Sequence, residues 1–88
     1  MLSRKFTIKN RLGLHARAAA QLVQTANQFS AEVMLQKEDV EVNGKSIMGI
    51  LLLAAPKGTE ISVAIDGSDE ERAMAVLADL IEGGFGED

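Results

Sequence analysis

The stretch AEVMLQKEDVEVNGKSIMGILLL, residues 31–53, carries most of the information about the fold. Ala31, Val33 and Leu35 fall on alternate positions, which predicts a strand over residues 31–36, and a turn over 37–39 leads to a second short strand over 40–42. A turn dipeptide follows at Asn43-Gly44. Ser46 suits a helix N-cap, so we predict a helix over residues 47–53, although periodicity alone leaves a buried strand open there.

The flanking sequence adds two strands and two helices. Alternation over residues 2–9 and 61–65 predicts two further half-buried strands. From Ala16 to about Asn27, apolar residues recur at helical spacing. A last helix is expected after Ser68 and before Gly83, with an S-x-x-E capping box at its start. The predicted buried stripe of this helix consists of Ala73, Val76, Leu77 and Leu80. Residues 85–88 are expected to form a tail, in which Glu87 and Asp88 are solvated.

The resulting order is β-α-β-β-α-β-α. Half-polar strands imply one sheet with one wet face, and the amphipathic helices must cover the other face. The sequence therefore predicts an α+β fold, a two-layer sandwich with a predominantly antiparallel sheet, as one domain over residues 1–88. The order in which the strands pair is not fixed by this pattern.

Composition excludes several classes of protein. The 88 residues contain no cysteine, which removes disulfide scaffolds and thiol metal sites, and no apolar run approaches a membrane span. A net charge of −4 argues against a general nucleic-acid binder, and three Phe with no Trp or Tyr give little support for base stacking or an aromatic cofactor pocket. We expect a cytoplasmic protein without a cofactor, and a monomer is the simplest assumption.

The one histidine, His15, stands where a glycine-containing loop becomes a helix. The first N–H groups of a helix have no intrahelical partners and attract anions. Arg17 adds a guanidinium that can bind phosphate oxygens, and the backbone at Ala16 and Arg17 would contribute donors. The same positive field disfavours a second proton on the ring, which leaves a nitrogen lone pair free to attack a phosphoryl group.

Other interpretations of His15 are an ordinary helix cap or a surface residue. Metal binding has less support, because no second histidine, no cysteine and no carboxylate within residues 1–31 accompanies it. A hydrolytic triad lacks a candidate nucleophile. Residue type and position alone leave the cap and the nucleophile open.

Two motifs resemble one known family. NRLGLHARAA, residues 10–19, looks like the active-site signature of HPr, the histidine-containing phosphocarrier of the bacterial phosphotransferase system. VNGKSIMGI, residues 42–50, resembles the regulatory-serine motif of that family, and AAPKGTEI, residues 54–61, continues the match. One departure is Ala18, where the family usually has proline, which we expect to loosen the start of the helix.

The resemblance implies a fold and a reaction. The fold is an open-faced sandwich of four antiparallel strands with three helices on one face. Enzyme I would pass a phosphoryl group to Nδ1 of His15, and an enzyme IIA would receive it, so the protein is a carrier with no turnover alone. The resemblance also implies regulation by phosphorylation at Ser46, with an HPr kinase/phosphorylase and catabolite control protein as further partners.

The helix over residues 47–53 is apolar on every side. Only one stripe can face the sheet, for which we expect Ile50 and Leu53. An apolar surface left exposed suggests docking. The candidate docking residues are Ile47, Met48, Leu51 and, on the His15 helix, Ala20.

Two alternatives to a sugar-transport carrier stay open. One is a binding module that uses the same sandwich without phosphotransfer. The other is a regulatory relative of HPr, in a nitrogen-related or catabolite-repression branch, that signals through its phosphorylation state.

Overall fold

The computed structural model describes residues 1–87 and contains the predicted elements in the predicted order. The bounds are β1 (Leu2–Thr7), α1 (Ala16–Ala26), β2 (Glu32–Lys37), β3 (Val40–Asn43), α2 (Ile47–Leu53), β4 (Glu60–Asp66) and α3 (Glu70–Glu82), followed by a single 3₁₀ turn, η1 (Gly84–Gly86). Ile47–Leu53 is a helix, which resolves the ambiguity of that apolar run.

The strands of the described chain form one antiparallel sheet in the order β1-β4-β2-β3. The central strand β4 pairs with β1 on one side and β2 on the other, so that Val63 lies opposite Arg4 and Leu35. This pairing joins the first strand of the chain to the last, which the sequence pattern did not specify.

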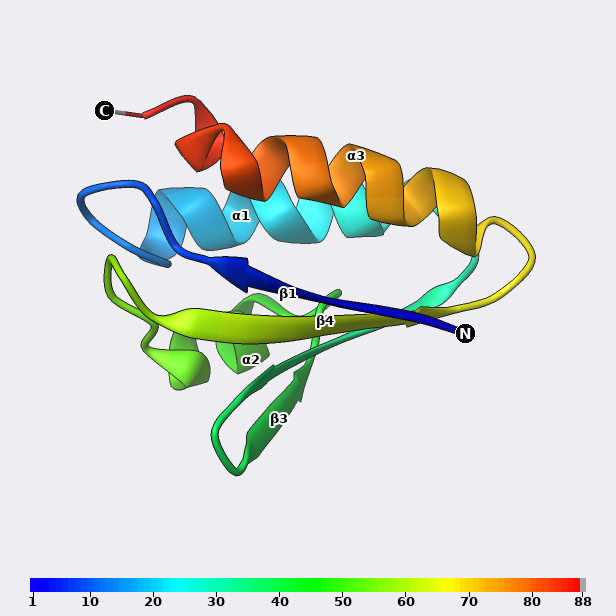
Figure 1. The fold of residues 1–88 in the computed structure, drawn as a ribbon, viewed down its shortest axis with the longest axis horizontal. Helices are drawn as coiled ribbons and strands as arrows, with labels where there is room; N and C mark the ends of the chain where they lie inside the picture. Colours follow the sequence, from blue (N-terminus) through cyan, green and yellow to red (C-terminus); the bar gives the residue numbers. More distant parts are fainter. Residues whose placement is uncertain (88) are drawn as a thin grey trace.

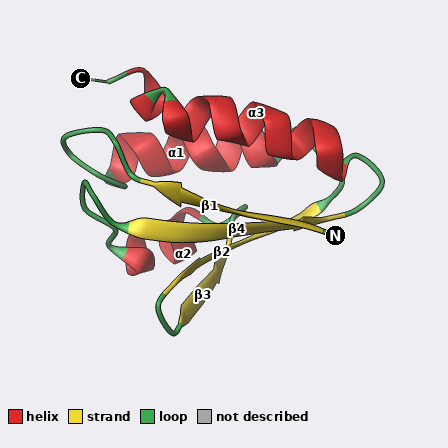
Figure 2. Cartoon of the chain, in the orientation of Figure 1, coloured by secondary structure: helices red, strands yellow, loops and turns green. Residues whose placement is uncertain are grey.

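One face of the sheet is covered by helices, and the other is open. Along β4, Ile61, Val63 and Ile65 are buried, whereas the residues between them are partly exposed. Helices α1 and α3 lie side by side over the sheet (Figures 1 and 2), and α2 packs against β3 and α1. The predicted open-faced sandwich is confirmed. No helix within residues 1–87 has the length and apolar content needed to cross a bilayer.

The predicted capping box of α3 is wrong. The residue that precedes the helix is Asp69, not Ser68, and its carboxylate accepts hydrogen bonds from the N–H groups of Ser30 and Ala31 at 2.8 and 2.9 Å. These two bonds tie the start of α3 to the segment before β2, and they lower the pKa of Asp69. Hydrogen bonds from two distant N–H groups to Asp69, rather than the local S-x-x-E motif, therefore accompany the start of α3.

The predicted buried stripe of α3 is also partly wrong: Ala73 and Leu77 are buried, but Val76 and Leu80 are not. Val76 is 37% exposed and Leu80 is only partly buried. The buried residues are Ala73, Met74, Leu77, Ala78 and Ile81. The buried residues recur at i, i+3 and i+4 on the side of α3 that faces the sheet. Because α3 has apolar residues on several sides, its sequence alone does not determine which side is buried.

The C-terminal residues do not form a solvated tail. Gly83 ends α3 as predicted, but Phe85 is 2% exposed and adopts a left-handed conformation with φ 57°. Glu87 follows in extended conformation and turns back toward the start of α1. Asp88, the last residue of the predicted tail, lies outside the described residues.

Candidate functional site

The loop between β1 and α1 places His15 at the N-terminus of α1. Gly13 has φ +69°, a conformation that L side chains rarely adopt, and a Cβ there would lie 2.5 Å from the carbonyl oxygen of Ala55. The next residue, Leu14, is buried and donates its N–H to that same oxygen at 2.9 Å. The loop is therefore fixed on its inner side, which leaves His15 on the outer side.

His15 stands at the start of a helix, as predicted, and it is the N-cap of α1, one of the interpretations that the sequence left open. Its Nδ1 accepts a hydrogen bond from the backbone N–H of Arg17 at 3.3 Å, and its carbonyl accepts from Ala19 at 2.8 Å. No acid stands in the first turn of α1. The imidazole thus caps a helix N-terminus that carries uncompensated positive partial charge.

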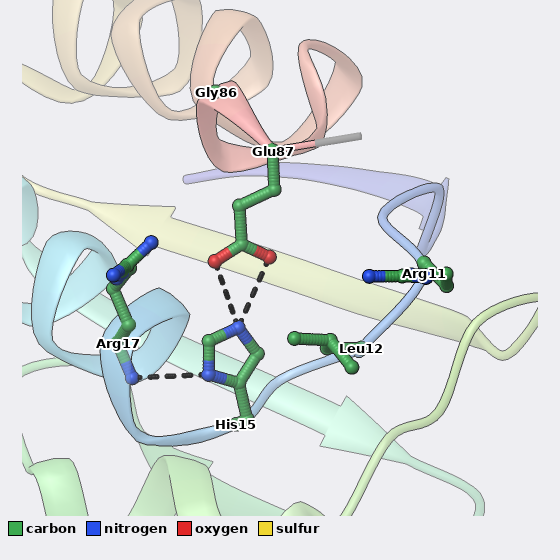
Figure 3. Close-up of a pocket in the computed structure, with 6 residues that line it drawn as sticks. All are labelled: Arg11, Leu12, His15, Arg17, Gly86 and Glu87. Carbon is green, nitrogen blue, oxygen red and sulfur yellow. Dashed lines mark hydrogen bonds and ion pairs between the residues drawn. The ribbon is translucent and has the colours of Figure 1, made fainter.

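The other ring nitrogen meets a carboxylate from the far end of the chain. Nε2 of His15 lies 2.8 Å from Oε2 and 3.0 Å from Oε1 of Glu87, which is 72 residues away (Figure 3). Asn10, which is 1% exposed, donates from Nδ2 to Oε1 of Glu87 at 2.9 Å and to the carbonyl of Gly13 at 2.7 Å. Hydrogen bonds from His15 and then Asn10, with the nearby charge of Arg17, hold the pKa of Glu87 below its usual range. Glu87 is therefore an anion under neutral conditions.

A pocket of about 520 Å³ opens beside the imidazole. It is lined by Arg11, Leu12, His15, Arg17, Gly86 and Glu87. Arg11 and Arg17 lie on opposite sides of the ring (Figure 3), and both are exposed. The pocket thus brings the imidazole, two guanidinium groups and a helix N-terminus together beside the Glu87 carboxylate. The guanidinium groups and the helix N-terminus can bind a small anion such as a phosphoryl group.

The predicted site residues fall into two groups. His15, Ala16 and Arg17 lie together at the start of α1, with Ala16 and Arg17 exposed. Ser46 is the N-cap of α2, where its hydroxyl accepts from the N–H of Gly49 at 3.1 Å. The candidate docking residues of α2 are exposed as expected, with Ile47 at 43%, Met48 at 71% and Leu51 at 37%, and Ala20 of α1 is partly buried.

Sequence reasoning missed Glu87, Asn10 and Arg11. The sequence signal that the C-terminus packs is a phenylalanine between two glycines, Gly84-Phe85-Gly86. This signal does not identify the residues that the C-terminus contacts. No group of three metal-ligating side chains occurs within residues 1–87.

Comparison with known proteins agrees with this arrangement. Residues 2–83 match the family model for the HPr component phosphorylation site of the phosphotransferase system. The chain is 56% identical over 87 residues to the phosphocarrier protein HPr of Neisseria meningitidis, covering 99% of this chain and 98% of the relative. Similarity to the HPr-like protein Crh of Bacillus subtilis is lower, at 42% over 82 residues, which cover 93% of this chain and 96% of that protein.

The same family appears among solved structures. The crystal structure of HPr from Thermoanaerobacter tengcongensis superposes with a TM-score of 0.96 at 46% identity, covering 100% of this chain and 99% of that one. The match spans the sheet, the helices and the loop that bears His15. The chain therefore belongs to the HPr family, the phosphocarrier proteins of the sugar phosphotransferase system, which carry a phosphoryl group without catalytic turnover of their own.

Proposed function

We propose that Nδ1 of His15 is the atom that carries the phosphoryl group. The observation that supports this assignment is the capping geometry: Nδ1 accepts from the N–H of Arg17 and therefore presents a lone pair at the start of α1. Nε2 is occupied by the carboxylate of Glu87 and faces away from the helix N-terminus. A phosphoryl group on Nδ1 would lie beside backbone donors, whereas one on Nε2 would meet an anion.

Ala16 and Arg17 serve as the phosphate-binding residues in this proposal. The N–H of Arg17 would exchange Nδ1 for a phosphoryl oxygen, and the N–H of Ala16 is the neighbouring donor of the first turn. The exposed guanidinium of Arg17 would supply charge-assisted hydrogen bonds to the same oxygens. Because these donors are few and open to solvent, they stabilise the phosphoryl group without preventing its release.

In this family the phosphoryl group comes from enzyme I and passes to an enzyme IIA. We propose that both partners dock on a face that includes Ile47, Met48 and Leu51 of α2 and Ala20 of α1. The exposed apolar area on α2 supports this surface, because such area is costly on a monomer unless it binds a partner. The basic groups beside His15 would complement acidic rims on those partners.

Ser46 is the proposed regulatory phosphorylation site, with an HPr kinase/phosphorylase as the modifying partner. Its hydroxyl lies at the N-terminus of α2, where a phosphate is tolerated by the helix. The added charge would stand next to the apolar docking residues and weaken contacts that depend on them. Catabolite control protein is a further proposed partner of the modified form. In that complex the added charge would strengthen binding rather than weaken it.

A regulatory role remains the second candidate function. The 42% identity to Crh supports it, but the 56% identity to HPr of N. meningitidis supports transport more strongly. We propose a cytoplasmic monomer with no nucleic-acid partner, in keeping with its net charge of −4.

The experiment is incubation with purified enzyme I and labelled phosphoenolpyruvate. Wild type should acquire an acid-labile, alkali-stable label, and His15→Ala should acquire none while retaining its circular dichroism spectrum. Arg17→Ala should be labelled more slowly, and Arg72→Ala, an exposed arginine on α3, is the matched control that should behave as wild type. An unlabelled wild-type protein with an active matched enzyme I would exclude the carrier function. Transfer from the labelled protein to different enzyme IIA proteins distinguishes transport from regulation.

A further inference from the structure

The C-terminal segment, residues 84–87, forms one wall of the His15 pocket. Glu87 of this segment contacts Nε2 of His15 with both carboxylate oxygens, at 2.8 and 3.0 Å. The two side chains shield each other, with 28% of the His15 side chain and 13% of the Glu87 side chain exposed. An interaction this short and this enclosed constrains the ring much more than a contact in open solvent would.

The segment that carries Glu87 is held from two sides. Phe85 is 2% exposed and anchors the turn in the core, while left-handed backbone at Gly84, Phe85 and Gly86 directs the chain back over the loop. Asn10 then fixes the carboxylate itself. Both acceptors of Asn10 Nδ2, the Gly13 carbonyl and Glu87 Oε1, are oxygens, so the orientation of this amide is determined. Glu87 is thereby positioned before any phosphoryl group arrives.

The carboxylate also determines which ring nitrogen bears the proton. An ionised carboxylate only accepts hydrogen bonds, so Nε2 must donate. The N–H of Arg17 only donates, so Nδ1 must accept. The two demands agree on one neutral tautomer, with the proton on Nε2 and the lone pair on Nδ1. At 3.3 Å the Arg17 contact is long, which leaves Glu87 as the stronger of the two constraints.

We propose that Glu87 is a positioning residue for phosphoryl transfer, which keeps a proton on Nε2 of His15 throughout the cycle. The proposal rests on the proposed role of Nδ1 as the phosphoryl acceptor. When Nδ1 attacks, its lone pair forms the N–P bond, and the electron pair of the breaking bond leaves with the donor. The ring becomes a cation that retains its Nε2 proton, and Glu87 neutralises it.

The reverse step needs the same proton. When the next acceptor attacks phosphorus, the N–P bond breaks and its electron pair returns to Nδ1. With Nε2 protonated, the ring departs as neutral imidazole; without that proton it would depart as an imidazolate anion, a much poorer leaving group. The Glu87 carboxylate therefore keeps the phosphoryl group transferable rather than merely bound.

The first test is the tautomer of unphosphorylated His15, read from long-range ¹H–¹⁵N spectra. Wild type should show Nε2 as the protonated nitrogen and Nδ1 as the unprotonated one. Removal of a hydrogen bond to a charged group in Glu87→Ala should change the tautomer ratio by about tenfold toward Nδ1–H. Glu87→Gln retains an acceptor without the charge and should restore much of the wild-type ratio, and Glu82→Gln, an exposed residue on α3, should leave it unchanged.

The second test is single-turnover transfer of the phosphoryl group from each phosphorylated variant to an enzyme IIA. We expect Glu87→Ala to transfer about tenfold more slowly than wild type and Glu87→Gln to lie between them. Unchanged ¹⁵N shifts in Glu87→Ala would overturn the proposal, and so would unchanged transfer despite altered shifts. If no variant, wild type included, accepts a phosphoryl group, the carrier function fails and with it the role of Glu87 in transfer, while the spectra still show whether Glu87 determines the tautomer of His15.

Discussion

Replacing Ala54 by glycine should stabilise the protein, although the same change usually destabilises one. Ala54 is the C-cap of α2 and has φ 48° and ψ 46°, in the left-handed region. That conformation costs an L residue about 1–2 kcal/mol, whereas glycine adopts it freely. The side chain of Ala54 is exposed, so its removal loses little packing.

The size of the gain is a difference of two terms. Relief of about 1.5 kcal/mol of backbone strain is offset by about 0.4–1 kcal/mol for the greater freedom of glycine in the unfolded chain. The net expectation for Ala54→Gly is about 0.5–1 kcal/mol of added stability. For a domain of this size, that corresponds to a rise of about 2–8 °C in Tm.

Urea unfolding at fixed pH measures this effect directly, because the midpoint shifts while the slope m stays constant. Ala75→Gly is the matched control: Ala75 is exposed in the middle of α3, where glycine should cost about 1 kcal/mol. The two variants should therefore move the midpoint in opposite directions. If Ala54→Gly destabilised the protein as much as Ala75→Gly, the left-handed cap would not exist in solution.

Four further changes test other parts of the fold and site. Gly13→Ala should cost about 2–4 kcal/mol in urea unfolding, because its φ is +69° and its Cβ would meet a backbone oxygen; a loss below about 0.5 kcal/mol would contradict the loop geometry. Ser46→Ala should cost about 1 kcal/mol through loss of the bond to the N–H of Gly49, and Ser46→Asn should recover most of it. Glu87 has a pKa lowered in the folded state by His15 and Asn10, so its contribution is present above its ordinary pKa of 4.5 and is lost as pH falls through the lower folded value; unfolding of wild type and Glu87→Gln from pH 3 to 7 should show their difference shrink toward the acid end, and a constant difference would argue against the contact. Met48→Asp should leave stability within about 0.5 kcal/mol of wild type because Met48 is 71% exposed, yet weaken enzyme I binding in calorimetry about tenfold; severe unfolding would show that Met48 is a core residue.

The sequence predicts those parts of the fold that depend on local patterns. Alternation identifies β4 because Ile61, Val63 and Ile65 do face the core, and a serine before an apolar run identifies the cap of α2. His15 was found for the same reason, since a glycine loop and an alanine-rich helix adjoin it in the chain. These features arise from interactions between residues a few positions apart.

The sequence does not predict features that depend on distant partners. Asp69 accepts two N–H groups from residues 38 and 39 positions earlier, and this long-range use displaced the predicted Ser68 cap. The sequence predicts a solvated Glu87, because Glu87 and Asp88 are two adjacent acids at the end of the chain. The contact of Glu87 with His15 depends on a turn that buries Phe85 and on Asn10 at the other end of the chain. Phe85 between two glycines is visible in the local sequence, but Asn10 lies at the other end of the chain and nothing around Glu87 points to it.

The two contacts of His15 differ in a way that suits a carrier. The bond from the N–H of Arg17 is 3.3 Å long and therefore weak, so a phosphoryl oxygen can replace Nδ1 as its acceptor at small cost. The contact of Nε2 with Glu87 is 2.8 Å long and is not on the side that the phosphoryl group would occupy. On the proposed mechanism, the ring keeps its orientation when it is loaded and when it is emptied, and only the weaker contact is exchanged. Neither state is then strongly favoured, which is what passage of the group between two partners requires.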